Sequence, residues 1–412
     1  MTAVPGGGAL GGGPRDRGAL GLTILLAGLS MFGPFSIDTV FPAFPAMGAQ
    51  LGADTAAMQQ VTSVYLLAFG AMSLFHGPIS DAVGRKPVIV TGITVYVLAS
   101  VGCALSTSLP MLITFRALQG LSAGGGQIVA RAVVRDRFEG PRAQAVMSHI
   151  VMIFGLAPAV APIVGGWILA FGPWPWIFWF LVAFGALMTG WVLVALPETH
   201  PPAARTALQV RPLLSGLWVI AKDADFQRTT AAMTFGFAGQ FLYIAAAPIL
   251  VVELLHQGPQ DFWKFFVPMI GGMVIGAYLT GRLATAMPSS TLVSRGFLIA
   301  ACAGVLNATV GLLGLAPMPW ALIGPTVIAF GIALVFPVMQ LRLLDLFPAR
   351  RGGAASVSSF AQLMFNALLA GAIVPFVSGS LLSLAVTSLG FVLLGWALWR
   401  WELSRTPLPA ES

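Results

Sequence analysis

Charged residues are scarce in this chain: they make up 8% of its 412 residues, whereas hydrophobic residues make up 57%. This balance excludes an ordinary soluble globular protein and is typical of a chain whose solvent is lipid. Lysine occurs only as Lys86, Lys222 and Lys264, and none of the three belongs to a Gly-Lys-Ser/Thr phosphate loop. The chain therefore cannot be the motor of an ATP-driven pump, although it could be the membrane half of one.

Cysteine and histidine are also rare. Cys103 and Cys302 lie inside apolar runs with no partner or ligand spacing nearby, so we expect both to be small lipid-embedded residues. The histidines fall near predicted membrane edges or in loops, which argues against a proton relay through any of them. They are His76, His149, His200 and His256. We expect no metal and no cofactor.

The net charge of +7 could suggest a nucleic-acid partner, but the basic residues recur in short groups between apolar runs rather than on one surface. Membrane topology explains them better. If the N-terminus lies in the cytoplasm, every basic residue except Arg116 and Lys264 falls at or near the cytoplasmic side, as the positive-inside rule requires. We expect both termini in the cytoplasm, the lipid bilayer as surroundings, no nucleic-acid partner and a monomer.

At about 20 residues per span, the apolar runs separate into twelve, and the long polar interruption at 197–226 divides them six plus six. We therefore expect an all-α integral membrane protein with twelve transmembrane helices in two six-helix pseudo-symmetric halves. The predicted spans are 19–43, 59–79, 87–107, 110–134, 145–170, 174–196, 227–252, 264–286, 293–314, 319–341, 353–377 and 381–401.

The predicted organisation has five parts. Residues 1–18 form a disordered cytoplasmic N-terminus, 19–196 the first bundle, 197–226 a cytoplasmic linker, 227–401 the second bundle and 402–412 a cytoplasmic tail. The first apolar run is too long for a signal peptide and is expected to be a retained helix. The linker has apolar residues at helical spacing, which predicts a short surface helix: Leu213, Leu214, Leu217, Trp218 and Ala221. The sixth span opens with aromatic residues expected at the outer interface: Trp174, Trp176, Phe178 and Trp179.

The two halves resemble each other. The segment after the fourth span and the segment after the tenth match in Asp, Phe, Arg and Ala, as Asp136, Phe138, Arg142 and Ala145 against Asp345, Phe347, Arg351 and Ala354. The constant offset and equal orientation predict parallel repeats, as in transporters whose halves move about a site at the membrane midplane.

Two ionisable residues lie within predicted spans. Asp38 is a lone acid in the first span, where an ionised carboxylate costs about 2.5 to 3.5 kcal/mol at the bilayer centre. It must face a cavity, pair with a cation or hold a proton. Arg116 in the fourth span cannot lose its charge and needs an acceptor. Asp38 is one candidate, and the alternative is that Arg116 binds backbone carbonyls in a purely structural role.

The turn between the second and third spans pairs an acid with bases: Gly77, Asp81, Gly84, Arg85 and Lys86. One interpretation is an ordinary positive-inside loop. The other is a gating latch, in which Asp81 faces the N-terminus of another helix and Arg85 reaches an acid such as Asp136. The corresponding loop of the second half has Thr280 in place of the acid, so a latch there would be weaker.

The fifth span has a pattern of glycine and proline that predicts a bendable, closely packed helix. Its residues are Gly155, Pro158, Pro162, Gly165 and Gly166.

These motifs together resemble the major facilitator superfamily. The turn at 77–87 is similar to its G-x-x-x-D-x-x-G-R-K signature, Arg116-Ala-Leu-Gln119-Gly120 to its fourth-helix motif, and the fifth span to the antiporter motif of proton-driven drug exporters. With Ser36-Ile37-Asp38 and Ala130-Arg131-Ala-Val-Val-Arg135-Asp136, the chain looks like the bicyclomycin and chloramphenicol resistance branch of the drug:proton antiporters. The resemblance covers 19–400. It implies a bacterial inner-membrane exporter of small, partly apolar antibiotics, with Asp38 and Arg116 in proton coupling and the turn stabilising an outward-open state.

Substrate-lining residues are predicted from type and position alone, because binding cavities are mostly aromatic and apolar with a few polar groups. Besides Asp38, they are Phe35, Tyr65, Phe69, Gln127, Phe237, Gln240, Phe241 and Gln362, with Asn307, Phe336 and Asn366 as further candidates. The same residue types also fill helix interfaces. Export of a metabolite such as an amino acid or sugar, and a uniporter or channel-like facilitator, stay open as alternatives.

Overall fold

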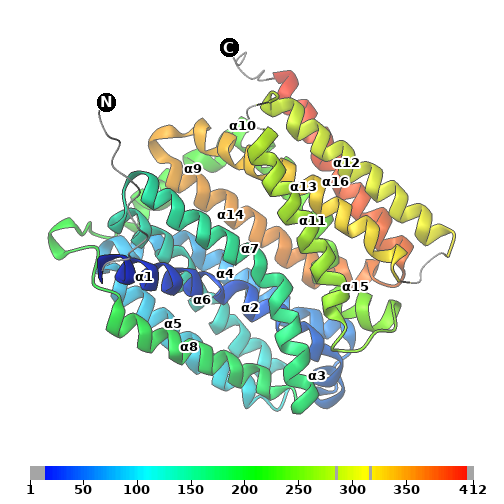
Figure 1. The fold of residues 1–412 in the computed structure, drawn as a ribbon, viewed down its shortest axis with the longest axis horizontal. Helices are drawn as coiled ribbons and strands as arrows, with labels where there is room; N and C mark the ends of the chain where they lie inside the picture. The colour runs from blue at the N-terminus through cyan, green and yellow to red at the C-terminus, as the bar shows by residue number, and fades with distance from the viewer. Residues whose placement is uncertain (1–13, 284–285, 315–317, 406–412) are drawn as a thin grey trace, which may run out of the picture.

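A computed structural model of the chain describes residues 14–283, 286–314 and 318–405. Over these ranges the chain forms helices and no β-strand, so the predicted all-α class is confirmed. Long helices run alongside one another across the molecule (Figure 1). The predicted tails at 1–13 and 406–412 lie outside the described residues.

The first half begins with a broken helix, α1 (Pro14–Ser30), α2 (Phe32–Asp38), η1 (Phe41–Ala43) and α3 (Phe44–Leu51). Five long helices follow, each matching one predicted apolar run. They are α4 (Thr55–Val83), α5 (Arg85–Ala104), α6 (Leu109–Arg137), α7 (Gly140–Phe171) and α8 (Pro175–Ala195).

The linker contains η2 (Pro202–Ala204) and α9 (Val210–Lys222). The second half comprises α10 (Ala224–Ala245), η3 (Ile249–Leu254), α11 (Phe262–Leu283), α12 (Ser289–Leu312), α13 (Trp320–Leu346), η4 (Pro348–Arg350), α14 (Arg351–Leu368), η5 (Leu369–Ile373), α15 (Val374–Val377) and α16 (Leu381–Arg405). Three boundaries of the predicted parts differ from expectation: α1 already begins at Pro14, α10 begins at Ala224, and α16 continues past 401.

Not every predicted span is apolar enough to be recognised by hydropathy alone. Within the described ranges, nine helices are long and apolar enough to cross a membrane, or ten if the bent pair at the start of the chain is one span. The helices α6 and α10 are long, but they carry polar residues such as Arg116 and Arg228. Because of these polar residues, α6 and α10 are not among the helices that are apolar enough to be counted.

The outer wall of the bundle is apolar. Large hydrophobic side chains such as Phe171, Val194 and Phe376 are almost fully exposed on it. In water such a surface would be a strong aggregation site, whereas in a bilayer it contacts lipid tails. The protein is therefore a multi-pass membrane protein.

The first helix is interrupted twice, by a bend at Met31 and by the end of α2 at Asp38. The axes of its two parts, Gly21–Ser30 and Phe32–Leu51, differ by 42°. Proline removes a backbone donor and interrupts the hydrogen-bond ladder, and Pro34, Pro42 and Pro45 all fall in this stretch. Asp38 is the last residue of α2.

The two halves pack against each other through two helix pairs, α4 with α14 and α7 with α11. Glycine permits the close approach. A Cβ atom on Gly70 would lie 2.9 Å from Leu363 of α14, and one on Gly166 would lie 2.5 Å from the carbonyl oxygen of Pro259.

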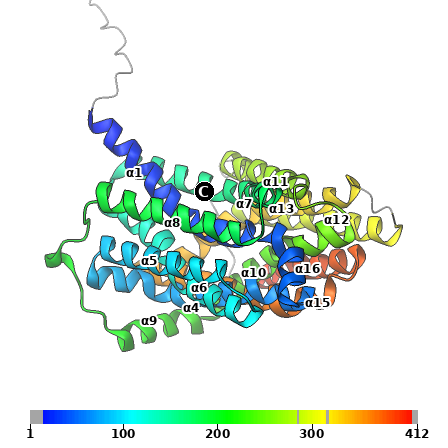
Figure 2. The same cartoon turned by 90° about the horizontal axis from the view of Figure 1, so that it is seen from below.

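The linker helix α9 lies at the edge of the bundle, joined to α8 by a long extended segment (Figure 2). It buries Leu217 and Ile220 near Gly353 at the start of α14, and exposes Trp218.

The expected aromatic belt is only partly present. Trp176 and Trp179 are exposed, but Trp174 is buried and donates from Nε1 to Gln50.

Candidate functional site

Asp38 lies at the end of α2 and is 4% exposed. No hydrogen bond or ion pair joins its carboxylate to any residue that the structure describes. An ionised carboxylate buried in this way is costly unless it is paired. The site therefore holds a carboxyl group whose charge the protein leaves uncompensated.

Arg116 projects from α6 and is completely buried. Its Nε donates to the carbonyl of Val61 on α4 at 3.1 Å, and its Nη1 donates to the carbonyl of Ser36 on α2 at 2.8 Å and to Gln119 Oε1 at 2.9 Å. The guanidinium also lies 4.5 Å from the ring centroid of Tyr65. Of the two acceptors considered for Arg116, the backbone is the one present, and no ion pair with Asp38 forms among the described residues.

The break after Asp38 explains how a carbonyl becomes available. The last carbonyls of a helix have no partner within it, and a cation is favoured there by the helix dipole. Ser36 is in the last turn of α2, so the helix end next to Asp38 is capped by the arginine of a neighbouring helix. Arg116 thus fixes the position of Asp38 without contacting it.

A polar network extends from this point into α5. The hydroxyls of Ser36 and Tyr96 are 2.6 Å apart, and Gln119 donates from Nε2 to Ser100 Oγ at 2.7 Å. Buried polar groups that are bonded in this way specify a single arrangement of the helices. Thr39 Oγ1 and Arg116 Nη2 are buried at the site and have no hydrogen-bond partner.

The proline- and glycine-rich helix α7 packs directly on this region. A Cβ atom on Gly165 would lie 2.1 Å from the carbonyl oxygen of Thr39, the residue after Asp38. Pro158 and Pro162 lie inside the same helix. On the side of the second half, Gly155 faces Met273 of α11 with a Cβ-to-Cε distance of 3.9 Å. The predicted antiporter segment therefore connects the Asp38 region with the second half.

The predicted substrate-lining residues fall into two groups. In the first half, Phe35 stacks on Phe180 and Phe184, and Tyr65 stacks on Phe69.

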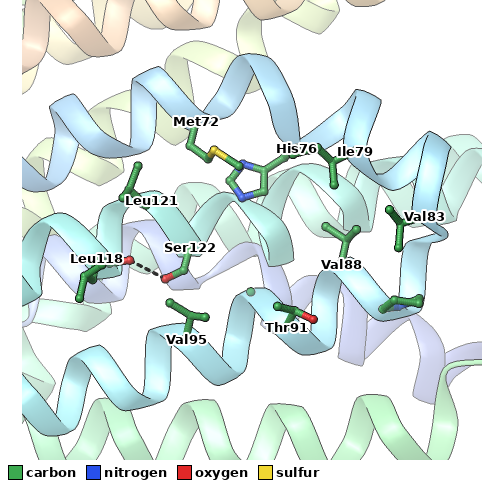
Figure 3. Close-up of a pocket in the computed structure, with 12 residues that line it drawn as sticks. Met72, His76, Ile79, Val83, Val88, Thr91, Val95, Leu118, Leu121 and Ser122 are labelled. Carbon is green, nitrogen blue, oxygen red and sulfur yellow. Dashed lines mark hydrogen bonds between the residues drawn. The ribbon is translucent and has the colours of Figure 1, made fainter. Parts of the chain in front are cut away.

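In the second half, Phe237 contacts both Phe241 and Phe336, while Gln240 donates from Nε2 to the sulfur of Met273. Two of the cavities in the structure are the one shown in Figure 3 and one of about 210 Å³ lined by residues of 44–58 together with Pro248 and Glu253. None of the predicted substrate-lining residues lines either of them.

The amides differ in their freedom to bind. Gln127 Oε1, Gln362 Nε2 and Asn366 Oδ1 are buried without a hydrogen-bond partner. Asn307 instead donates to the hydroxyl of Tyr243 at 2.6 Å and packs against Gly324 inside the second bundle. The amide of Asn307 is therefore engaged within the second bundle, and its candidacy as a cavity residue stays a prediction.

The turn between α4 and α5 forms a charge cluster. Arg85 forms an ion pair with Asp81 and donates from Nε to Asp136 Oδ2 at 2.9 Å. Gly84 has a φ of 113°, which glycine adopts without strain. Gly77 has open space around it, and Lys86 donates from Nζ to the Leu193 carbonyl. The side chain of Asp81 is 46% exposed, so it does not cap another helix in this structure.

Sequence reasoning missed an acid in this cluster. Glu198, just after α8, accepts the backbone N–H groups of Arg85 at 3.0 Å and Lys86 at 3.3 Å. It therefore caps the N-terminus of α5, where negative charge is favoured. The sequence did indicate this residue in one way: Glu198 is an acid directly after the last predicted span of the first half.

A second missed acid occupies the matching place in the second half. Glu402 in α16 is fully buried, and its two oxygens accept from Arg228 Nε and Arg342 Nη2, each at 2.7 Å. The charge cluster of the second half therefore centres on α10, α13 and α16. It does not lie at the loop containing Thr280, whose hydroxyl bonds to the carbonyls of Gly276 and Ala333.

At the opposite end of α4, hydrogen bonds join the two halves. Thr55 donates to Glu253 at 2.9 Å, Gln60 Nε2 to the Gly371 carbonyl at 2.8 Å and Ser63 to the Ala367 carbonyl at 2.7 Å. Gly371 lies in the π-helix η5, where the α-helical ladder is interrupted, and Ala367 lies in the last turn of α14 directly before it. The halves are thus closed against each other at the Thr55 end.

A pseudo-symmetric bundle of long apolar helices, with an unpaired buried carboxyl beside a broken helix, defines a membrane transporter rather than an enzyme. A model of the Major Facilitator Superfamily matches residues 22–375. The chain belongs to this superfamily.

Curated relatives and a solved structure are consistent with that assignment. The chain is 29% identical over 296 residues to the Bicyclomycin resistance protein homolog of Haemophilus influenzae, covering 71% of this chain and 74% of that protein. It is 28% identical over 370 residues to Multidrug resistance protein D of Escherichia coli, covering 89% and 92%. The human organic anion transporter MFSD10 shares the fold with a TM-score of 0.67 at 19% identity, covering 94% of this chain and 100% of that one.

Proposed function

We propose that the protein is a proton-coupled efflux antiporter that exports small, partly apolar antibiotics of the phenicol or bicyclomycin class by alternating access. The observation that carries this proposal is Asp38, which is buried beside a helix break and has no partner among the described residues. A carboxyl group in such a place is stable when it holds a proton, and its deprotonation requires access to water or a new partner. Proton binding and release can therefore favour different conformations.

In this proposal Arg116 positions the Asp38 segment through the Ser36 and Val61 carbonyls. Gly165 transmits movement between that segment and α7, because its backbone contacts Thr39 directly. Protonation of Asp38 from outside and its deprotonation toward the cytoplasm would exchange protons for substrate. The names of the relatives in Haemophilus influenzae and Escherichia coli support an antibiotic as the cargo.

The proposed orientation has both termini in the cytoplasm of a bacterial cell. The Thr55 end of α4 then faces outward, and the hydrogen bonds from Gln60 to η5 and from Ser63 to the end of α14 close the outer side. The exposed Asp81 and its partner Arg85 lie on the inner side. Of the proposed latch only the Arg85–Asp136 pair is formed, while Asp81 is exposed, and together with the closed outer side this supports an inward-facing state.

The test uses inside-out vesicles containing the protein and radiolabelled chloramphenicol or bicyclomycin. An imposed pH gradient should drive accumulation by the wild type and none by Asp38→Asn. Exchange of labelled for unlabelled compound at equal pH should persist in Asp38→Asn, because that step moves no proton. Asp54→Asn is the matched control: Asp54 is exposed, and Asn caps a helix as well as Asp does.

Accumulation in Asp38→Asn at the wild-type rate would remove the proposed role of the carboxyl. If the wild type moves neither antibiotic, amino acids and sugars tested in the same vesicles decide whether a metabolite is the cargo. Transport that persists after a protonophore collapses the gradient would indicate a facilitator.

A further inference from the structure

A cavity of about 390 Å³ lies in the first half between α4, α5 and α6 (Figure 3). Its lining is almost entirely apolar, with His76, Thr91 and Ser122 as the polar side chains and no charged one. The volume is within the range of small-molecule sites, which combine an apolar wall with a few polar groups. The residues proposed for proton coupling and substrate binding do not line it.

Glycines create this space. Gly92 on α5 faces α6 so closely that a Cβ atom would lie 3.1 Å from the Ser122 carbonyl oxygen and 3.4 Å from the Cα of Gly125. The imidazole of His76 lies over Gly124, where a Cβ atom would be 2.8 Å from His76 Nδ1. The three helices are therefore packed closely at these glycines. The cavity lies beside this contact, where the larger side chains hold the helices further apart.

His76 is the unexplained group at this hollow. It lies seven residues before the end of α4, and it is 4% exposed. Its Nδ1 lies near the Met72 carbonyl and Gly124 and does not face the hollow, whereas Nε2 makes no hydrogen bond with any described residue. Figure 3 shows a ring nitrogen pointing into the space between α4 and α5.

The cavity opens on the outer wall of the bundle. Residues along its edge are exposed apolar side chains: Val83, Val95, Leu118 and Leu121. This wall contacts lipid, so a molecule reaches the cavity from the bilayer rather than from water. A lipid acyl chain could fill the apolar part but would leave the imidazole unbonded.

We propose that this cavity is a binding site for an uncharged, membrane-dissolved small molecule with an apolar ring and one hydroxyl group. The apolar part would occupy the hollow between α4, α5 and α6, and the hydroxyl would bond to His76. The absence of a charged side chain from the lining excludes an ionic ligand, because nothing would replace its hydration. The site is separate from the proposed transport pathway.

Photolabelling of the protein in phosphatidylcholine vesicles tests this assignment. The probe is a trifluoromethyl-diazirinyl benzyl alcohol, and the matching toluene, which lacks only the hydroxyl, is its control. Saturable labelling by the alcohol should map to peptides that contain 72–95 and 118–122. Thr91→Trp fills the cavity and should abolish it. Thr94→Trp, also exposed on α5 but not part of the lining, should leave it unchanged.

His76→Phe separates the hydrogen bond from the apolar contact. It should raise the concentration of the alcohol needed for half-saturation about threefold to tenfold, as expected for the loss of one neutral hydrogen bond. Labelling by the toluene should stay as in the wild type. Labelling that rises linearly with probe concentration, or that survives Thr91→Trp, would mean a lipid-filled groove and overturn the proposal. Equal affinity for the alcohol in His76→Phe would remove the role of the imidazole.

Discussion

Replacing Arg116 with lysine keeps the positive charge at the site but removes the geometry of the guanidinium. Nε and Nη1 donate to Val61, Ser36 and Gln119 from two separate atoms, whereas the donors of lysine are all on one atom. We expect lysine to retain one of these three bonds. If Arg116 served only as a charge near Asp38, Arg116→Lys would be almost neutral.

The magnitude follows from the bonds lost. A hydrogen bond to a charged group contributes about 1.5 to 3 kcal/mol, so the loss of two corresponds to about 3 to 6 kcal/mol. The partners are on α2, α4 and α6, and the loss should therefore loosen the first half as a whole. We expect Arg116→Lys to melt several degrees below the wild type and to lose transport driven by a pH gradient.

Fluorescence-detected thermal unfolding of the purified protein measures the stability change, and inside-out vesicles measure transport. Arg135→Lys is the matched control, because Arg135 lies on the same helix and is exposed. If Arg116→Lys has the same melting temperature as the wild type, the hydrogen bonds to the carbonyls do not stabilise the fold. If it also transports normally, the positioning of Asp38 by Arg116 is wrong.

Three further predictions concern single contacts. Gly165→Ala places a methyl group against the Thr39 carbonyl and should abolish transport, measured in vesicles, whereas Gly190→Ala, which has open space, should not. Glu402→Gln leaves two arginines without a full counter-charge and should cost about 3 kcal/mol in thermal unfolding. Hydrogen bonds from Lys264 and then from the Gly258 backbone lower the pKa of Asp261 below its ordinary value of 3.8. Its stabilising effect, measured as the melting difference from Asp261→Asn, should persist above pH 4 and disappear as pH falls further.

Each of these has an outcome that contradicts it. Equal transport by Gly165→Ala and Gly190→Ala would mean that α7 does not need its close approach. An unchanged melting temperature in Glu402→Gln would show that the buried cluster is not stabilising. A melting difference that stays constant down to pH 2 would mean that the carboxylate of Asp261 does not stabilise the protein through its charge.

Much of the fold followed from local composition. Over the described residues every predicted apolar run is largely helical, because 20 or so apolar residues without a break can be satisfied in lipid only as a helix. The family was predictable from the turn at 77–87 and the glycine and proline pattern of α7, since these motifs are contiguous in the chain. The segment 197–226 likewise contains α9 close to the predicted positions.

What sequence reasoning missed depended on side-chain partners. Trp174 looked like a belt residue, but it is buried and Gln50 binds its indole. The amide of Asn307 is bound by a tyrosine hydroxyl 64 positions away, which no local pattern indicated.

The sequence by itself determined the helical membrane fold, the family and the rarity of Asp38 and Arg116, because hydropathy and motif spacing are properties of neighbouring residues. Only the tertiary structure decided which acceptors Arg116 uses, that Asp38 is left unpaired and that Gly165 contacts Thr39. These contacts join segments far apart in the chain, and a buried polar group takes whichever partner packing brings within about 3 Å. That choice is not encoded in any local pattern.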